Sequence, residues 1–190
     1  KVCAKWHIWN ERCARVMNLI LIGFMGSGKT TVGQLLAQTL GFTFADTDQL
    51  IEAGEEMTIS EIFEKNGEGY FRQLETLIME EISNTMQDTV LSVGGGLPMT
   101  EKNHKYLKKI GKVIYLKVSE QTVIERLKGE SGRPLLSGDD ATEMIYRLLS
   151  QRHPTYQMLA DVVIDTDDMQ IEEVVDEIIR QNLLNEEGNR

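Results

Sequence analysis

The chain has 190 residues, of which 41% are hydrophobic and 26% are charged, values typical of a single globular domain with a full hydrophobic core. Its formal net charge of -10 at pH 7 argues against DNA, RNA and other polyanions as partners of the surface as a whole. No apolar stretch approaches the ~20 residues that a membrane-spanning helix needs, so we expect no membrane partner.

The first sixteen residues differ from the rest of the chain. They hold both tryptophans and both cysteines and show no periodicity, whereas Met17 opens the first predicted strand. We therefore expect a non-native or disordered leader over 1–16, a single domain over 17–185 and a frayed tail over 186–190. Because both cysteines lie in this leader, the domain has none with which to form a disulfide, which is consistent with a cytoplasmic protein.

After the leader, short apolar runs alternate with helical patterns, an order typical of a parallel sheet covered by helices. The predicted strands cover 18–22, 43–45, 90–93, 113–118 and 162–164. The predicted helices cover 29–40, 58–67, 68–86, 101–110, 120–128, 140–159 and 171–184. Right-handed crossovers between such strands give an α/β fold with a five-stranded parallel sheet.

Local signals mark the ends of two predicted helices. Gly41 follows the first helix and can adopt the left-handed conformation that commonly ends one. Thr58 and Glu61 have the spacing of a capping box, so a helix should begin there and end near Gly67.

A glycine-rich segment directly follows the first predicted strand. Residues 23–30 read Gly-Phe-Met-Gly-Ser-Gly-Lys-Thr, the pattern of a phosphate-binding loop. Its glycines let backbone N–H groups surround phosphate oxygens, Lys29 can reach the β- and γ-phosphates, and Thr30 can ligate Mg²⁺. The helix that follows would direct its positive N-terminus at the anion. A chance match in a glycine-rich turn would not need both the strand before it and the helix after it.

Two aspartates follow the second predicted strand, at the sheet edge where ligands of parallel sheets collect. In an extended chain, Asp46 and Asp48 point to the same side, so both carboxylates could face one site. One could hold hydrated Mg²⁺ while the other accepts a hydrogen bond from a substrate hydroxyl. The alternative is that they cap a helix, Asp48 in particular.

Three consecutive glycines and two arginines are further candidates for the site. Gly94, Gly95 and Gly96 follow the third predicted strand and could bring backbone N–H groups close to a ligand, or could form a plain flexible turn. Arg72 and Arg152 suit bidentate binding of a carboxylate or phosphate. The alternative for each arginine is a solvated surface group or an ion pair.

The loop at 129–140 contains three glycines and the run Arg133-Pro134-Leu135-Leu136. We expect it to be a mobile lid that closes Arg133 over the phosphates and excludes water. The alternative is that Arg133 pairs with a neighbouring acidic residue and only tethers the loop.

In order and spacing, these motifs resemble those of the shikimate kinase family, small P-loop kinases of the nucleoside monophosphate kinase type. The resemblance covers 17 to about 184. It rests on the phosphate-binding loop, Asp46-Thr47-Asp48, Phe71-Arg72-x-x-Glu75, the triple glycine, Arg133-Pro134-Leu135-Leu136 and Arg152-x-Pro154-x-Tyr156. It implies a three-layer P-loop kinase fold with a mobile lid, and transfer of the ATP γ-phosphoryl group to the 3-hydroxyl of shikimate.

The resemblance also implies roles for the matching residues. ATP, a co-substrate, would be bound by Gly26, Ser27, Gly28, Lys29, Thr30, Thr31, Arg126 and Arg133. The Mg²⁺ ligands would be Thr30 and, through water, Asp46. Shikimate would be bound by Asp48, Arg72, Gly94, Gly95, Gly96 and Arg152. The catalytic residues would be Lys29, Asp48 and Arg133. The mobile substrate-binding segment would include Ile59, Phe63, Glu68 and Phe71.

Two other functions share part of this pattern. Another small-molecule kinase, such as a gluconate kinase, would have the phosphate-binding loop and the lid arginine. It would not need two arginines for a substrate carboxylate. A non-catalytic nucleotide-binding module would be expected to lack Lys29, Asp46, Asp48 or Arg133, and all four are present. The small size of the single domain favours a monomer. One departure from the family pattern is Met158, where many relatives carry an acidic residue.

Overall fold

The computed structural model describes residues 17–127 and 141–187. The predicted leader, the predicted lid with Arg133 and the last three residues of the predicted tail therefore lie outside the described residues. Among the residues that are described, no helix is both long and apolar enough to cross a bilayer.

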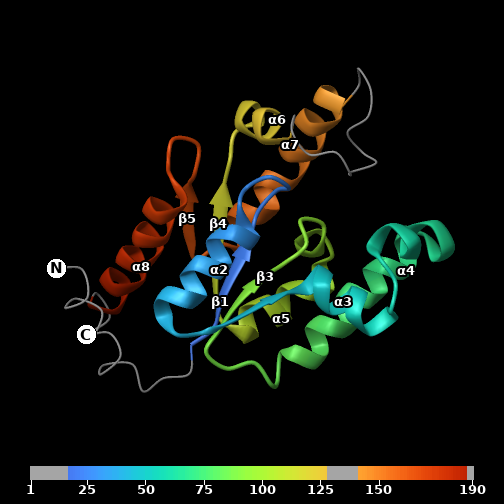
Figure 1. Cartoon of the computed structure of the whole chain (residues 1–190), viewed down its shortest axis with the longest axis horizontal. Coiled ribbons are helices and arrows are strands. Elements are labelled where there is room, and N and C mark those ends of the chain that lie inside the picture. The colour runs from blue at the N-terminus through green and yellow to red at the C-terminus, as the bar shows by residue number, and fades with distance from the viewer. Residues whose placement is uncertain (1–16, 128–140, 188–190) are drawn as a thin grey trace.

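The strands form one five-stranded parallel sheet, as the sequence predicts (Figure 1). They are β1 (Leu19–Ile22), β2 (Thr43–Asp46), β3 (Thr89–Ser92), β4 (Lys112–Lys117) and β5 (Val162–Asp165). The spatial order is β2-β3-β1-β4-β5, and every neighbouring pair is parallel. The strand order therefore switches beside β1, because the chain adds β2 and β3 on one side of this strand and β4 and β5 on the other. Ligands of open α/β sheets bind at such switch points, and β1 leads into the phosphate-binding loop.

Helices connect the strands and cover both faces of the sheet. They are α2 (Lys29–Leu40), α3 (Thr47–Glu55), α4 (Ile59–Ile82), α5 (His104–Ile110), α6 (Glu120–Leu127), α7 (Ala141–Leu159) and α8 (Ile171–Glu187). Two short 3₁₀ turns, η1 (Leu97–Met99) and η2 (Glu101–Asn103), precede α5.

Successive residues of β1 belong to two different hydrophobic cores, because side chains alternate across a strand. Leu19 and Leu21 pack with residues of α2 and α8. Ile20 and Ile22 pack with residues of α4, α5, α6 and α7. All four β1 side chains are buried, so the sheet lies between two helical layers and the predicted three-layer architecture is confirmed.

Several boundaries differ from the sequence-based expectation. Helix α3 was not predicted, and it begins directly at the end of β2. The capping box at Thr58 and Glu61 is confirmed, and so is the predicted break near Gly67, because α4 consists of two helical segments joined at a non-helical residue there. Gly67 has a φ of 79°, a left-handed conformation that favours glycine, and this residue therefore allows the helix axis to bend. Helix α8 continues to Glu187, past its expected end at Leu184.

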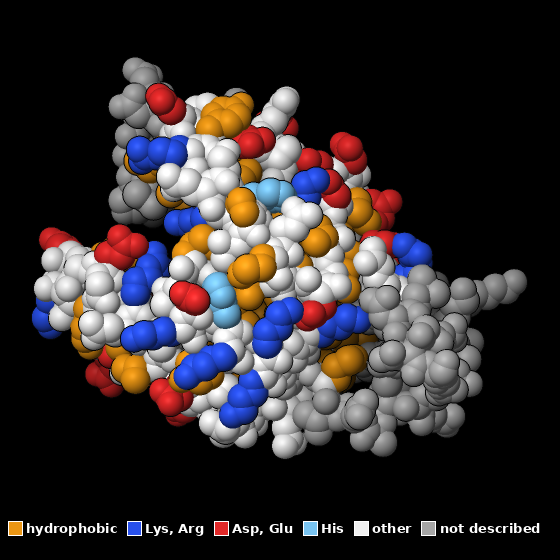
Figure 2. Space-filling view, turned by 180° about the vertical axis from the view of Figure 1, so that it is seen from behind, with side chains coloured by type: hydrophobic (Ala, Val, Ile, Leu, Met, Phe, Trp, Pro, Cys, Tyr) orange, Lys and Arg blue, Asp and Glu red, His pale blue; other side chains and the backbone are white. Residues whose placement is uncertain are grey.

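Basic side chains gather on the lower half of the face shown in Figure 2, although the chain as a whole is acidic. Helix α5 carries Lys105, Lys108 and Lys109. The ammonium of Lys108 lies 2.9 Å from the Asp161 carboxylate, and that of Lys109 donates to Asn84. Part of this positive charge is therefore already engaged within the molecule.

Asn18 precedes β1 and connects it, through side-chain hydrogen bonds, to the segments at the amino ends of β3 and β4. Its amide group donates to the carbonyls of Met86 and Ile110 at 3.0 and 2.9 Å and accepts from the Thr89 N–H at 3.1 Å. The backbone of Asn18 is consequently held in place, and it passes directly beside Gly111 at the start of β4.

We expect Gly111→Ala to lower the free energy of unfolding by about 1–3 kcal/mol, a typical cost of overpacking. The added methyl group would collide with the Asn18 carbonyl, which is backbone held by the contacts above. Gly54→Ala is the matched control, because nothing lies within 4 Å of its added methyl group inside α3. It should stabilise the protein by about 0.5 kcal/mol. Urea unfolding of both variants measures this, and equal losses would contradict the role of Gly111.

Candidate active site

A pocket of about 640 Å³ lies at the carboxyl ends of β1, β2 and β3. Most of the predicted site residues line it: Gly26, Gly28, Lys29, Thr30, Thr31, Asp46, Asp48, Arg72, Gly94, Gly95, Gly96 and Arg152. A second pocket of about 700 Å³ adjoins it and is lined by the predicted residues Ser27 and Arg126. The two pockets share Gly26, Gly28 and Thr31, so the phosphate-binding loop separates one compartment from the other.

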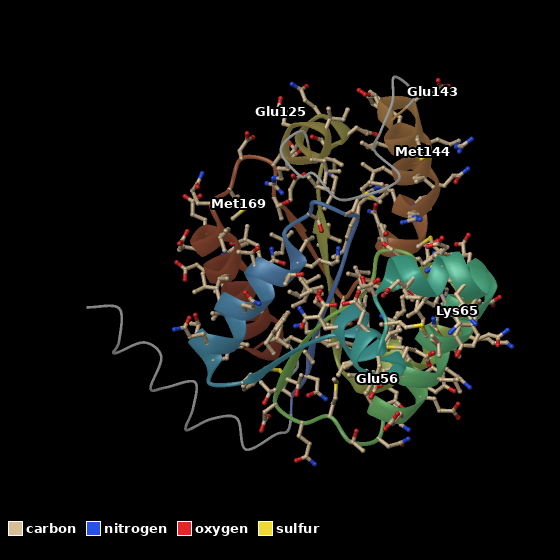
Figure 3. All side chains as sticks on the ribbon, turned by 45° about the vertical axis from the view of Figure 1, so that its right-hand side comes forward. Glu56, Lys65, Glu125, Glu143, Met144 and Met169 are labelled. Carbon is tan, nitrogen blue, oxygen red and sulfur yellow. The ribbon has the colours of Figure 1, made fainter. Side chains whose placement is uncertain are left out.

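From the phosphate-binding loop that they share, the two pockets extend toward different helices, whose positions can be followed in Figure 3. Met169, which lines the second pocket, lies on the connection from β5 to α8. Glu56 and Lys65 mark the opposite side, where α3 and α4 flank the first pocket. A nucleotide in the second pocket and an acceptor in the first could therefore meet at the phosphate-binding loop.

The phosphate-binding loop turns sharply before α2 begins at Lys29. Gly26 and Gly28 have φ values of 75° and 87°, a left-handed conformation that favours glycine. The Lys29 ammonium donates to the carbonyls of Gly23 and Phe24 at 3.0 and 2.9 Å. The N-terminus of α2 and this ammonium thus both lie at the loop, where an anion would be favoured.

Arg126 on α6 connects the loop with the second pocket. Its guanidinium donates to the Gly26 carbonyl at 3.1 Å and to the Thr166 carbonyl at 3.0 Å. Because Gly26 and Thr166 both line this pocket, the planar guanidinium is held at its wall and is available to a flat ring.

Asp46 is the last residue of β2 and the N-cap of α3, which corrects the geometry expected for the two aspartates. One carboxylate oxygen accepts the Asp48 N–H at 3.0 Å, and the other accepts the Thr30 hydroxyl at 3.3 Å. Asp48 lies in the first turn of α3, so the prediction of an extended chain through both residues is wrong. The cap is Asp46 rather than Asp48, because its carboxylate satisfies a free N–H of the first helical turn.

Asp48 still points into the first pocket. Its Oδ1 is buried and has no hydrogen-bond partner among the described residues. Burial raises the pKa of Asp48 to about 6, the nearby negative charge of Asp46 adds to this, and the positive charge of Lys29 opposes it. A carboxylate with a raised pKa and an unused oxygen is suited to accept a proton from a ligand hydroxyl.

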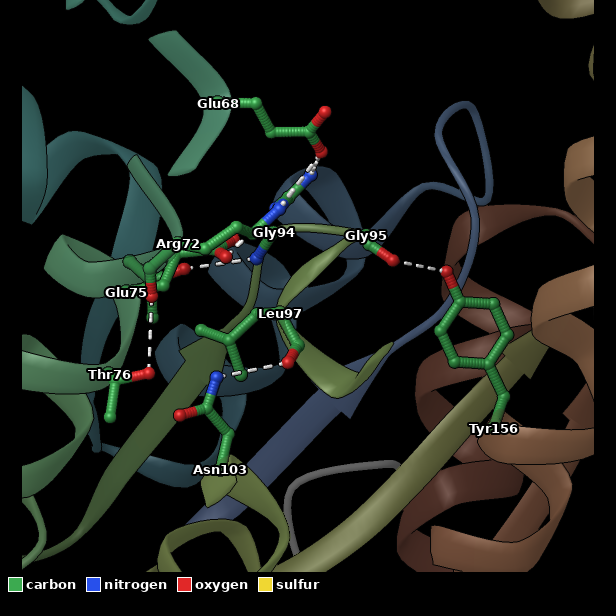
Figure 4. Close-up of polar contacts among 10 residues, drawn as sticks. Glu68, Arg72, Glu75, Thr76, Gly94, Gly95, Leu97, Asn103 and Tyr156 are labelled. Atoms are coloured by element: carbon green, nitrogen blue, oxygen red, sulfur yellow. Dashed lines mark hydrogen bonds and ion pairs between the residues drawn. The ribbon is translucent and has the colours of Figure 1, made fainter. Parts of the chain in front are cut away.

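Arg72 is held by two carboxylates of its own helix (Figure 4). Its guanidinium lies 2.8 Å from the exposed Glu68 and 2.8 Å from Glu75, which is 1% exposed. It also lies against Gly96, where an added methyl group would come within 2.7 Å of its Cζ atom. The ion-pair alternative is therefore confirmed, and Arg72 also lines the first pocket.

Glu75 is a pocket residue to which sequence reasoning gave no role. Burial raises the pKa of Glu75 to about 7, although the Arg72 guanidinium opposes this. Its Oε1 is buried without a partner among the described residues, as is Oδ1 of Asp48. Both oxygens lie beside Gly94, within 3.3 and 2.6 Å of the position that a methyl group would take. The sequence did contain a signal for this contact, because Glu75 follows Arg72 by three residues and side chains at that spacing are neighbours on a helix.

Arg152 on α7 approaches the middle residue of the glycine wall, which we define as Gly94, Gly95 and Gly96. Its Nη1 would lie 3.6 Å from a methyl group on Gly95. The Gly94 N–H donates to the Thr47 hydroxyl at 3.0 Å, which fastens the wall to the start of α3. The structure thus brings the wall, both arginines and Asp48 to one pocket.

The sequence of the chain matches one family along most of its length. A family model described as shikimate kinase matches residues 25–182. The shikimate kinase of Thermodesulfovibrio yellowstonii is 44% identical, over 86% of this chain and 94% of that protein. The shikimate kinase of Caldanaerobacter subterraneus subsp. tengcongensis is 43% identical over the same shares of the two chains.

Solved structures give the same result. A shikimate kinase from Acinetobacter baumannii in complex with shikimate superposes with a TM-score of 0.84 and 36% identity, covering 90% of this chain and 94% of that chain. A gluconokinase from Sinorhizobium meliloti shares only 17% identity with a TM-score of 0.55, which shows a common fold alone. By its sequence and by its structure, the chain belongs to the shikimate kinase family.

Proposed function

We propose that this protein transfers the γ-phosphoryl group of ATP to the 3-hydroxyl of shikimate, giving shikimate 3-phosphate and ADP. The reaction belongs to the synthesis of chorismate and the aromatic amino acids. The observation that carries the proposal is the first pocket, which is lined together by a phosphate-binding loop, a half-buried aspartate, two arginines and a wall of glycines. Among relatives, the structural match to a shikimate kinase with shikimate supports it.

ATP would place its phosphates at the loop and its base in the second pocket. Backbone N–H groups of Gly26, Ser27 and Gly28 would surround the phosphate oxygens, and Lys29 would turn from its loop carbonyls toward the transferring group. Arg126, held at the wall of the second pocket, would stack on the adenine. Thr31, which lines both pockets, would contact the phosphates from the first turn of α2.

The oxygen atoms of Thr30 and Asp46 fit a hydrated Mg²⁺, because this ion prefers a few carboxylate or hydroxyl oxygens together with water and phosphate. The two side chains are already joined by a hydrogen bond of 3.3 Å at the phosphate end of the first pocket. When bound, the ion would neutralise charge on the phosphate oxygens.

Shikimate carries a carboxylate and three ring hydroxyls, and the first pocket offers a partner for each type of group. Arg72 and Arg152 would bind the carboxylate, since both guanidinium groups reach the glycine wall. Oδ1 of Asp48, which has no partner within 17–127 or 141–187, would accept a hydrogen bond from the hydroxyl that receives the phosphoryl group, and would take its proton. The protein would contribute mainly positioning and neutralisation of charge, which phosphoryl transfer requires most.

Arg133 is expected to close over the phosphates with the lid, a part of the proposal that concerns residues outside the described range. We further propose a cytoplasmic monomer that acts on small molecules without binding nucleic acid. The small single domain supports the monomer, the net charge of -10 argues against nucleic acid, and the absence of cysteines after Cys13 is consistent with the cytoplasm.

The proposal predicts that ATP turnover depends on both shikimate and Mg²⁺. A coupled assay of ADP release should show turnover with shikimate, little with gluconate and little without an acceptor. Chelation of Mg²⁺ with EDTA should remove the activity, and added Mg²⁺ should restore it. Equal ADP release with and without shikimate would refute the proposed acceptor.

A further inference from the structure

Tyr156 lies on α7 four residues after Arg152, so the two side chains share one face of the helix. Its side chain is fully buried, and its ring packs against that of Tyr115 on β4 with 5.1 Å between the ring centroids. The Tyr115 hydroxyl in turn lies 3.0 Å from Nδ1 of His153. The ring of Tyr156 is therefore held by its packing against Tyr115, and its hydroxyl points toward the edge of the sheet where the first pocket lies.

The Tyr156 hydroxyl donates a hydrogen bond of 2.6 Å to the Gly95 carbonyl (Figure 4). Burial raises the pKa of Tyr156 to about 12, although the adjacent Arg152 guanidinium lowers it. The phenol therefore keeps its proton and remains a donor. A methyl group on Gly95 would lie 3.5 Å from this hydroxyl and 3.6 Å from Nη1 of Arg152, so the three groups converge at one point.

The glycine wall has no side chains of its own with which to fix its position. Backbone turns order it from within, as the N–H groups of Leu97 and Met99 donate to the carbonyls of Gly94 and Gly96 at 3.0 Å each. Thr47 anchors one end of the wall to α3, as described above. Tyr156 anchors its middle to α7, the same helix that carries Arg152.

We propose that Tyr156 is a positioning residue of the acceptor site, whose hydroxyl fixes the Gly95 wall and the Arg152 guanidinium relative to each other. Affinity for an acceptor that carries a carboxylate then depends on a tyrosine that need not touch the acceptor. This inference rests on the proposed function, because it assigns the carboxylate of shikimate to Arg152.

The first test is Tyr156→Phe, which removes the hydroxyl and keeps the packed ring. We expect the KM for shikimate to rise about fivefold, as for the loss of one hydrogen bond, with kcat and the KM for ATP within about twofold of wild type. Tyr146→Phe is the matched control, because Tyr146 lies on the same helix and is 47% exposed. A purely structural role would change the active fraction and leave both KM values unchanged, which would overturn the inference.

The second test is a double-mutant cycle between Tyr156→Phe and Arg152→Ala. If the hydroxyl acts through Arg152, removing it should change the KM for shikimate less than about twofold once the guanidinium is absent. Independent effects that multiply in the double variant would contradict positioning through Arg152.

A third measurement needs no substrate. Amide hydrogen exchange at Leu97 and Met99 should be about threefold faster in Tyr156→Phe, while exchange in β1 stays unchanged. Equal exchange in the variant and the wild type would overturn the inference. If the wild-type protein did not phosphorylate shikimate, the proposed function would fail alone, and the exchange rates would still decide whether Tyr156 fixes the wall.

Discussion

Asp48→Asn should reduce turnover by about 10²–10⁴-fold, the usual contribution of a general base, while the KM for ATP stays close to that of wild type. The change keeps the shape of the side chain and removes the charge that would accept the proton. Asp48 faces the acceptor side of the pocket, and its Oδ1 has no other partner among the described residues. Weaker binding of shikimate should accompany the loss, because an amide is a poorer acceptor than a carboxylate.

Single-turnover kinetics with ATP and shikimate would measure the chemical step directly. A variant with wild-type turnover would show that Asp48 is not the general base. Glu52→Gln, also on α3 and close enough for its charge to affect Asp48, is a suitable control and should keep most of the activity.

The same variant has a second readout that does not depend on catalysis. The folded protein holds the pKa of Asp48 at about 6, above the value of 3.8 for a model carboxyl, so ionisation of Asp48 makes folding less favourable. This cost is absent below about pH 4 and complete above about pH 6. Asp48→Asn should therefore be more stable than wild type by on the order of 2–3 kcal/mol at pH 8, with the difference vanishing at low pH. Urea unfolding at several pH values would measure it.

The sheet could be predicted from the sequence because its strands are buried on both faces and form continuous apolar runs. The four residues of β1 are all buried. The glycines that follow this strand could be recognised as a phosphate-binding loop, because its tight turn needs the left-handed conformation that glycine adopts. Helix α3 could not be predicted in the same way. The two aspartates were expected in an extended chain, whereas the Asp46 carboxylate accepts the Asp48 N–H and caps the first turn of a helix.

Two residues to which sequence reasoning gave no role, Tyr156 and Glu75, support other residues of the site. Tyr156 donates a hydrogen bond to Gly95, which lies 61 residues earlier in the sequence, and no local sequence pattern predicts this contact. Glu75 is buried although glutamate is usually exposed, because Arg72 supplies a counter-charge within the pocket. Spacing along a helix suggested which side chains share a face, but the sheet order was needed to show which face meets the glycine wall.

Arg72→Ala and Arg152→Ala should each raise the KM for shikimate about 10–100-fold, as for the loss of a hydrogen bond to a charged group. Both arginines are assigned to one carboxylate, so the double variant should be less than additive. Lysine should rescue poorly at either position, because an ammonium cannot form the bidentate contact of a guanidinium. An ester of shikimate should be a poor substrate of the wild type and should lose little more in either variant.

Arg72→Ala needs its own control because it removes the ion-pair partner of the buried Glu75. Unfolding should become easier by about 1–3 kcal/mol, the cost of an unsatisfied buried group. Adding Glu75→Gln should recover part of this stability without restoring affinity for shikimate, which separates folding from binding. Arg180→Ala, which removes an exposed ion pair with Glu177 on α8, should change neither quantity. If Arg72→Ala leaves the KM for shikimate unchanged, Arg72 serves only to neutralise Glu75, and the carboxylate of the acceptor must be bound by Arg152 alone.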